Sequence, residues 1–247
     1  MQKLLFLVFI SKEDVMGRDV IIACDFNSKE EVINFLSKFE NEKPFVKIGM
    51  ELFYAEGPEI IKEIKRRGHK IFLDLKLHDI PNTVYKAMKN VAKLGVDMTN
   101  VHAAGTIEMM KAAQKAIDEV NPETKLIAVT QLTSTSEQMM QEELWINHPI
   151  NDTVQHYAKN AQLAGLAGVV CSPLEAHLVQ EVCGEDFMTV TPGIRFDDAS
   201  KGDQKRVTTP AMAKEIGSHF IVVGRPITAA EDPVAAYQRC VREFVGE

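Results

Sequence analysis

The sequence has few of the features on which covalent cross-links and zinc sites depend. Its four cysteines are Cys24, Cys171, Cys183 and Cys240. No two of them have the Cys-x-x-Cys spacing that zinc and redox motifs use. Each lies within or beside an apolar run, as reduced and buried thiols do in proteins of a reducing compartment. The sequence therefore indicates neither a disulfide framework nor a metal centre, and it predicts a cytoplasmic protein.

An excess of positive charge is also missing. The net charge of −7 and the pI near 5.6 disfavour a nucleic-acid partner, because such proteins carry a basic patch or stripe. Long apolar runs are missing too, since the stretch within residues 1–10 has only about seven apolar residues, too few to span a bilayer. No small-residue cleavage site follows it. We expect neither nucleic acid nor membrane as a partner.

The chain is nevertheless long and apolar enough to bury a large core. It has 247 residues, of which 45% are hydrophobic. Met16 stands just before Gly17 and the first convincing strand. We therefore expect residues 17–247 to form a single domain, and residues 1–16 to be a dispensable extension or the product of an upstream start.

Apolar runs alternate with helical patterns along the whole chain. The runs end near Asp25, Lys47, Lys76, His102, Thr130, Ser172, Thr191 and Gly224. Most are followed by apolar residues at helical spacing, and prolines that suit first helical turns stand at 58, 173, 210 and 233. Eight such alternations favour the α/β class and a (β/α)8 TIM barrel. A doubly wound open sheet fits less well, because no Gly-x-Gly-x-x-Gly turn follows the first strand.

The run from Asp74 to Thr83 is the most informative segment. It closes an apolar strand, and the period of two along a strand places Asp74 and Lys76 on one face. Two readings are open. In the first, Asp74 and Lys76 form a structural ion pair at a strand end, and Asp79 caps the helix that Pro81 opens. In the second, these charges belong to an active site.

The ends of the neighbouring strands favour the active site. Asp25 and Lys47 also follow apolar runs directly, and catalytic groups of a parallel barrel gather at the carboxyl ends of its strands. The last two strands are followed by Arg195 and by Gly224-Arg225, where barrels commonly bind phosphate. The connections 134–152 and 193–209 are unusually long, and the second is either a lid over the site or a solvated loop.

Six shorter motifs accompany the run from Asp74 to Thr83. They are Cys24-Asp25-Phe26, Val46-Lys47-Ile48-Gly49, Asn100-Val101-His102-Ala103, Gln131-Leu132-Thr133-Ser134, Thr191-Pro192-Gly193-Ile194-Arg195 and Val223-Gly224-Arg225-Pro226. From about Val20 to the C-terminus, this ordered set resembles the orotidine 5'-phosphate decarboxylase family in its bacterial form. A lone Asp-x-Lys-x-x-Asp would be less specific, because related barrels share it.

The resemblance implies an enzyme of pyrimidine biosynthesis that converts orotidine 5'-phosphate to uridine 5'-phosphate and CO2 without a cofactor or metal. It implies that Lys47, Asp74, Lys76 and Asp79 form an alternating charge array around C6 of the pyrimidine, with Lys76 as the proton donor. It further implies a homodimer with shared active sites, in which Asp79 and Thr83 enter the site of the other subunit.

The same resemblance assigns the substrate contacts. Asp25 and Lys47 would hold the ribose hydroxyls, and Thr133 and Ser134 would face the base. The phosphate would be bound by Arg195, Gln204, Gly224 and Arg225. The remaining implied contacts are Leu75, Leu77, His78, Ile80, Pro81, Asn82 and Pro192.

Two alternatives remain open. One is a metal-dependent sugar-phosphate decarboxylase or synthase of the same barrel group, in which a Glu metal ligand typically occupies the position of Lys47. A cation at that position disfavours a metal. The other is a non-catalytic nucleotide sensor, which would need the phosphate and ribose contacts but not Lys76 and its carboxylate neighbours.

Overall fold

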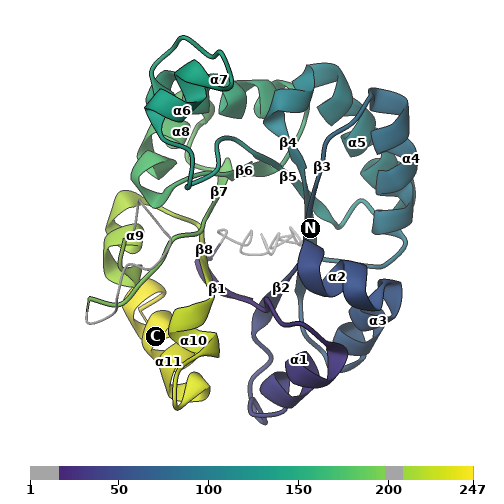
Figure 1. Ribbon diagram of the computed structural model, residues 1–247, viewed down its shortest axis with the longest axis vertical. Coiled ribbons are helices and arrows are strands. Elements are labelled where there is room, and N and C mark those ends of the chain that lie inside the picture. Colours follow the sequence, from purple (N-terminus) through teal and green to yellow (C-terminus); the bar gives the residue numbers. More distant parts are fainter. Residues whose placement is uncertain (1–16, 198–207, 247) are drawn as a thin grey trace, which may run out of the picture.

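The computed structural model of the protein describes residues 17–197 and 208–246. Its eight strands are all parallel and form a closed barrel in sequence order, β1 to β8, as Figure 1 shows. The strands are β1 (Asp19–Ala23), β2 (Phe45–Gly49), β3 (Ile71–Leu77), β4 (Met98–His102), β5 (Lys125–Val129), β6 (Gly168–Val170), β7 (Met188–Thr191) and β8 (Phe220–Val223). The predicted (β/α)8 barrel is confirmed.

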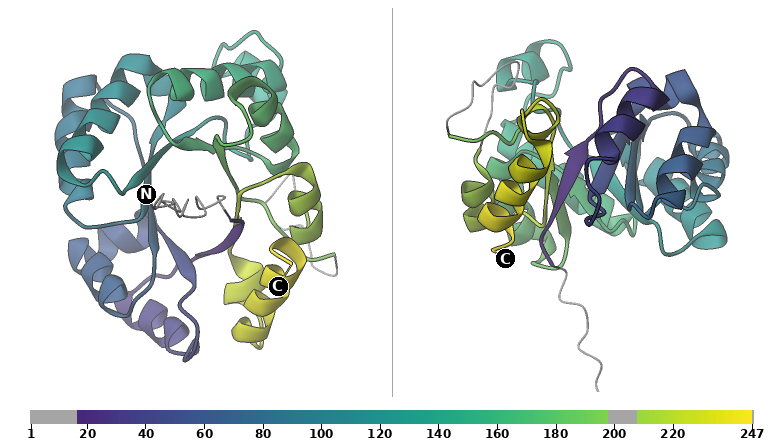
Figure 2. Two further views of the ribbon diagram at one scale, coloured as in Figure 1. Left: turned by 180° about the vertical axis from the view of Figure 1, so that it is seen from behind. Right: turned by 90° about the horizontal axis from the view of Figure 1, so that it is seen from below.

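Helices surround the barrel on the outside, as both views of Figure 2 show. The α-helices are α1 (Lys29–Leu36), α2 (Met50–Glu56), α3 (Pro58–Arg66), α4 (Pro81–Ala92), α5 (Thr106–Val120), α6 (Glu137–Glu142), α7 (Ile150–Leu163), α8 (Ala176–Cys183), α9 (Pro210–Ile216), α10 (Arg225–Thr228) and α11 (Pro233–Phe244). Short 3-10 helices, η1 (Ala103–Gly105) and η2 (Pro173–Glu175), follow β4 and β6. No helix in the described ranges is long and apolar enough to cross a membrane.

The strands divide the apolar residues into two cores. Alternate side chains point into the barrel, where Ile21, Phe45 and Phe72 belong to a small interior cluster. The intervening residues, such as Ile22 and Val46, pack against the helices in a larger outer cluster. Because both faces are covered, the strands are apolar almost throughout.

The interior leaves little room in places. A Cβ added at Gly168 on β6 would lie 2.3 Å from the backbone oxygen of Met188 on β7, so only glycine fits there. Interior side chains such as Met188 pack below the mouth of the barrel, and a cavity lies at the carboxyl ends of the strands.

The local signals at helix ends are largely confirmed. Pro58, Pro173, Pro210 and Pro233 occupy first-turn positions. None of the four cysteines, all of which lie within the described residues, forms a disulfide, and Cys183 is the one that is only half-buried. Residues 1–16 lie outside the described residues, so their expected dispensability stays a prediction.

Candidate active site

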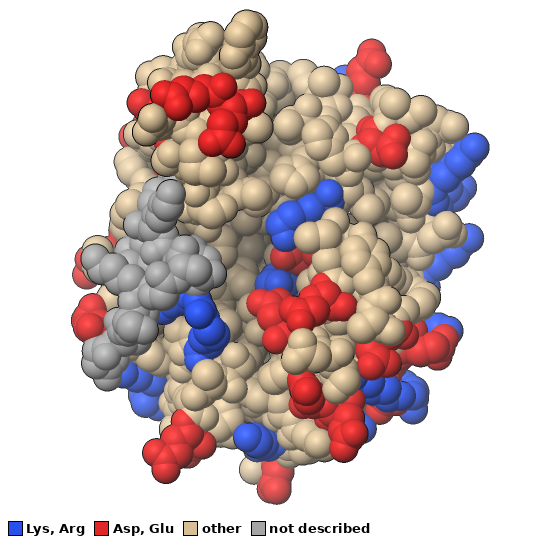
Figure 3. All heavy atoms as spheres, in the orientation of Figure 1, with Lys and Arg blue, Asp and Glu red and all other residues tan. Residues whose placement is uncertain are grey.

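Charged side chains lie at the mouth of the barrel, because alternate residues along each strand point to its interior. Lys47 stands two residues beyond the interior Phe45, and Asp74 stands two residues beyond the interior Phe72. Lys47, Asp74 and Lys76 line a cavity of about 280 Å³ whose floor includes apolar interior residues such as Phe72. Figure 3 shows a hollow at the centre of this face, with basic and acidic side chains along its rim.

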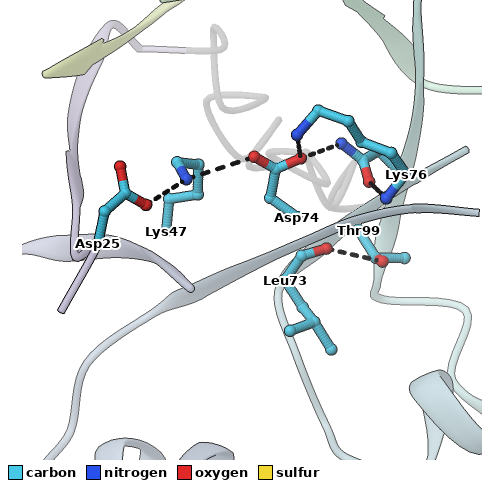
Figure 4. A network of polar contacts seen from close by, with 7 residues as sticks. Asp25, Lys47, Leu73, Asp74, Lys76 and Thr99 are labelled. Carbon is cyan, nitrogen blue, oxygen red and sulfur yellow. Dashed lines mark hydrogen bonds and ion pairs between the residues drawn. The ribbon is translucent and has the colours of Figure 1, made fainter. Parts of the chain in front are cut away.

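The charges form a continuous chain across three neighbouring strands. The Lys47 ammonium lies 3.0 Å from Oδ1 of Asp25 and 3.4 Å from Oδ2 of Asp74. The Lys76 ammonium lies 2.7 Å from Oδ1 of Asp74. Figure 4 shows the four side chains in this alternating order of sign. The predicted pairing of Asp74 with Lys76 is confirmed, and it is part of a larger network.

The network keeps its buried members charged. Burial alone disfavours the Lys47 ammonium, but the carboxylates of Asp74 and Asp25 outweigh it and raise the pKa of Lys47. Burial likewise disfavours the Asp74 carboxylate, but Lys47, Lys76 and a hydrogen bond from Asn100 together lower the pKa of Asp74. Both groups therefore stay ionised around neutral pH. A fixed carboxylate beside two fixed ammonium groups can stabilise or repel charge that develops on a ligand in the cavity.

Lys76 stands on irregular backbone. Its φ of 52° lies in the left-handed region, which residues other than glycine seldom adopt. The pairing of β3 with β4 shifts register between Leu73 and Leu77, so Lys76 belongs to a bulge. The strict alternation of a strand, on which the prediction rested, is therefore interrupted there. Lys76 nevertheless reaches Asp74, because the bulge redirects its side chain toward the network.

Asn100 on β4 is a member of this network that the sequence analysis did not identify as a site residue. Its side-chain amide donates a hydrogen bond of 2.7 Å to Oδ1 of Asp74, and its side-chain oxygen accepts one of 2.8 Å from the backbone N–H of Lys76. Asn100 is fully buried. In the sequence it appeared only as the first residue of the motif Asn100-Val101-His102-Ala103, to which no role was assigned.

The opposite wall of the cavity holds other predicted residues. Thr133 and Ser134, which follow β5, and Pro192, which follows β7, line the cavity with Lys47 and Lys76. Leu75 is buried and Leu77 is half-buried. The structure thus brings the residues that were predicted to face the base to the same cavity as the charges.

The residues from His78 to Thr83 are all exposed and do not line this cavity. Oδ1 of Asp79 accepts a hydrogen bond of 2.6 Å from the N–H of Ile80. The N-cap of α4 is Ile80, without a side-chain cap, so the expectation that Asp79 caps this helix is wrong. Asp79 lies one residue too early for its carboxylate to reach the N–H groups of the first turn. His78, Ile80, Pro81 and Asn82 lie on the same exposed segment.

The predicted phosphate-binding residues follow the last two strands. Arg195 is half-buried beyond β7, and its guanidinium donates to the carbonyl oxygen of Ile194 at 2.7 Å. Gly224 and Arg225 stand at the start of α10, directly after β8. Gln204 and the centre of the connection 193–209 lie outside the described residues.

The charged groups of the site are not arranged as metal ligands. Within residues 17–197 and 208–246, no group of three or more His, Cys, Asp or Glu is placed to hold a metal ion. At the mouth of the barrel, each carboxylate of the network instead faces a lysine ammonium. This donor set fits an anionic ligand better than a cation.

Comparisons with known proteins show the family of this chain. Residues 18–240 match the family model described as "Orotidine 5'-phosphate decarboxylase / HUMPS family". The orotidine 5'-phosphate decarboxylase of Staphylococcus saprophyticus is 60% identical over 92% of this chain and 98% of its own, and that of Geobacillus sp. WCH70 is 55% identical over 94% and 99%. A crystal structure of the Lactobacillus acidophilus enzyme of the same name has a TM-score of 0.84 at 46% identity and covers 92% of this chain and 99% of its own. The chain therefore belongs to the orotidine 5'-phosphate decarboxylase / HUMPS family.

Proposed function

We propose that this protein decarboxylates orotidine 5'-phosphate to uridine 5'-phosphate and CO2 in the cytoplasmic synthesis of pyrimidines. The observation that carries the proposal is the Asp25–Lys47–Asp74–Lys76 chain of alternating charges at the mouth of the barrel. Relatives that bear this enzyme name at 55–60% identity support the same substrate. Lys47 disfavours the metal-dependent alternative, because an ammonium stands where a metal ligand would be needed.

The chemistry follows from the charges. The bond between C6 and the carboxylate breaks, its electron pair stays on C6, and CO2 leaves. The Lys76 ammonium stabilises that negative charge and then transfers a proton to C6, leaving a neutral amine that water reprotonates. Asp74 and its hydrogen-bond partners hold the ammonium in place. No cofactor is needed, because the protein supplies both the electrostatic stabilisation and the proton.

The remaining residues bind the rest of the nucleotide. Asp25 and Lys47 hold the ribose hydroxyls, and Thr133 and Ser134 contact the base. The phosphate lies beyond the last two strands, where Arg195, Gln204 and Arg225 bind its oxygens. These assignments follow the family pattern, and the positions of Arg195 and Arg225 after β7 and β8 support them.

The site is completed by a second subunit in this proposal. Asp79 and Thr83 are exposed and lie outside the cavity of their own chain. In a homodimer they would reach the cavity of the partner and add a second carboxylate beside its Lys76. A closed two-fold dimer places the same segment of each chain opposite the other.

The decisive experiment measures the loss of orotidine 5'-phosphate absorbance by the purified protein with a chelator present. We expect full turnover, with uridine 5'-phosphate and CO2 as products. Strict dependence on added magnesium would instead favour the sugar-phosphate alternative. Tight binding of uridine 5'-phosphate without any turnover would favour the nucleotide sensor.

A further inference from the structure

The bulge in β3 leaves a gap in the hydrogen-bond ladder at the most critical point of the site. In the register of β3 with β4, Leu73 pairs with Thr99, and the next pair is Leu77 with Val101. Three residues of β3, from Asp74 to Lys76, therefore stand opposite the single residue Asn100. A ladder interrupted in this way leaves backbone groups without strand partners.

The Asn100 side chain fills this gap. The Lys76 backbone N–H can only donate, so the atom that faces it at 2.8 Å is the amide oxygen of Asn100. The amide nitrogen, which can only donate, then faces Oδ1 of Asp74 at 2.7 Å, and that oxygen accepts its hydrogen bond. One planar group thus joins the backbone of Lys76 to the side chain of Asp74.

Both hydrogen bonds of the Asn100 amide affect where the Lys76 ammonium lies. Oδ1 of Asp74 also accepts from the Lys76 ammonium at 2.7 Å, and its other oxygen faces Lys47. Asn100 is 0% exposed, so water cannot substitute for either hydrogen bond. The left-handed φ of Lys76 needs such a constraint, since unusual backbone persists only where the surroundings determine it.

We propose that Asn100 is a positioning residue, whose amide holds the bulged backbone of Lys76 and the carboxylate of Asp74 in one fixed arrangement. It does not touch the substrate and acts through the two charged residues. This inference rests on the proposed decarboxylation for its kinetic test. The effect on Lys76 itself can be measured in the free protein.

The test compares two variants with a matched control. Asn100→Asp in its ionised form keeps an acceptor for the Lys76 N–H but loses the donor to Asp74 and faces it with a second carboxylate. Asn100→Leu removes both hydrogen bonds. Thr99→Val is the control, because Thr99 is equally buried on the same strand and its hydroxyl donates to the Leu73 carbonyl at 3.0 Å, outside the bulge.

The first readout is hydrogen exchange at the Lys76 amide without ligand. We expect Asn100→Leu to speed exchange about 10- to 100-fold, and Asn100→Asp and Thr99→Val to leave it near wild type. Unchanged exchange in Asn100→Leu would overturn the backbone half of the proposal. If Asn100→Leu does not fold, Asn100→Ser, whose side chain is too short to reach both partners, tests the same contact. We then expect faster exchange at the Lys76 amide together with loss of turnover.

The second readout separates kcat from KM. Both Asn100→Leu and Asn100→Asp should lower kcat about 10- to 100-fold, while KM changes less than about threefold. A displaced Lys76 ammonium stabilises the transition state less well, whereas substrate binding depends on it less. Thr99→Val should keep kcat within about twofold of wild type. Wild-type kcat in Asn100→Asp, or an equal loss in Thr99→Val, would overturn the positioning role. Absence of turnover in the unmodified protein would contradict the proposed function instead, and the exchange result would still stand.

Discussion

Within the run from Asp74 to Thr83, the first two residues are buried, the next two are half-buried and the last six are exposed. Asp74 accepts from Lys76 and Asn100 and lies 3.4 Å from Lys47, whereas Asp79 accepts only from the N–H of its neighbour Ile80 among the described residues. Two carboxylates five positions apart thus have opposite surroundings. One chain completes the environment of Asp74 and leaves that of Asp79 open.

The difference separates two kinds of functional residue. A buried carboxylate must be paired, because an isolated buried charge is very unfavourable. Its partners therefore identify its site within one chain. An exposed carboxylate is stabilised by water and needs no partner, so its function depends on what approaches it. This contrast supports the proposal that Asp79 and Thr83 serve a second subunit.

The largest effect on turnover is expected from a change at Lys76, in the part of the run that lines the cavity. Lys76→Ala removes both the ammonium that stabilises charge at C6 and the proton that replaces CO2. We expect kcat to fall by at least about 10⁴-fold. Turnover is measured by absorbance, and circular dichroism with a uridine 5'-phosphate binding assay controls for folding. Ordinary turnover would contradict the role of Lys76 as proton donor.

The next largest effect on turnover is expected from a change at Asp79, in the exposed segment 78–83. Asp79→Ala should lower kcat by about 10²- to 10³-fold, because a charge of the array is lost from the partner's site.

Mixing this variant with Lys76→Ala tests the sharing directly. A mixed dimer would have one site with both native residues, so random exchange of subunits should restore about a quarter of wild-type activity. A mixture that stays inactive after refolding together would show that each site uses its own Asp79.

The pH dependence of stability should distinguish the two carboxylates. Because the pKa of Asp74 is lowered on folding, its contribution is fully present above the unfolded value of about 3.9 and is lost as pH falls through the folded pKa. Asp74→Asn should cost about 2 kcal/mol of unfolding free energy at pH 7. The cost should shrink as pH falls below about 4 and through the lowered folded pKa of Asp74, as measured by denaturant unfolding. A cost that is constant with pH would mean that the charge of Asp74 is not what stabilises the fold.

The smallest effect is expected for stability in the exposed segment 78–83. Asp79→Asn should move the thermal midpoint by less than about 2 °C at a fixed protein concentration, since within the described residues its carboxylate accepts a single local hydrogen bond. A large drop would show that Asp79 contributes to the fold or to subunit contact in a way that its surroundings in one chain do not reveal.

Much of the site could be predicted because its rules are local. Strand alternation carried Asp25, Lys47 and Asp74 to the mouth of the barrel, and the apolar runs before them marked the strand ends. The bulge at Lys76 could not be predicted, because lysine has no preference for a positive φ. The reading in which Asp79 caps α4 was wrong because the N-cap is Ile80, one residue later than the sequence pattern indicated.

The sequence by itself determined the (β/α)8 barrel and the order of charges at its strand ends, because periodicity and helix-start residues act over a few positions. Only the tertiary structure decided how those charges are held. Asn100 lies 26 positions from Asp74 in the chain, and closing the barrel places it opposite the bulge, where its amide replaces the missing strand contacts. No local pattern encodes that contact, since it depends on the register between two strands that a helix separates.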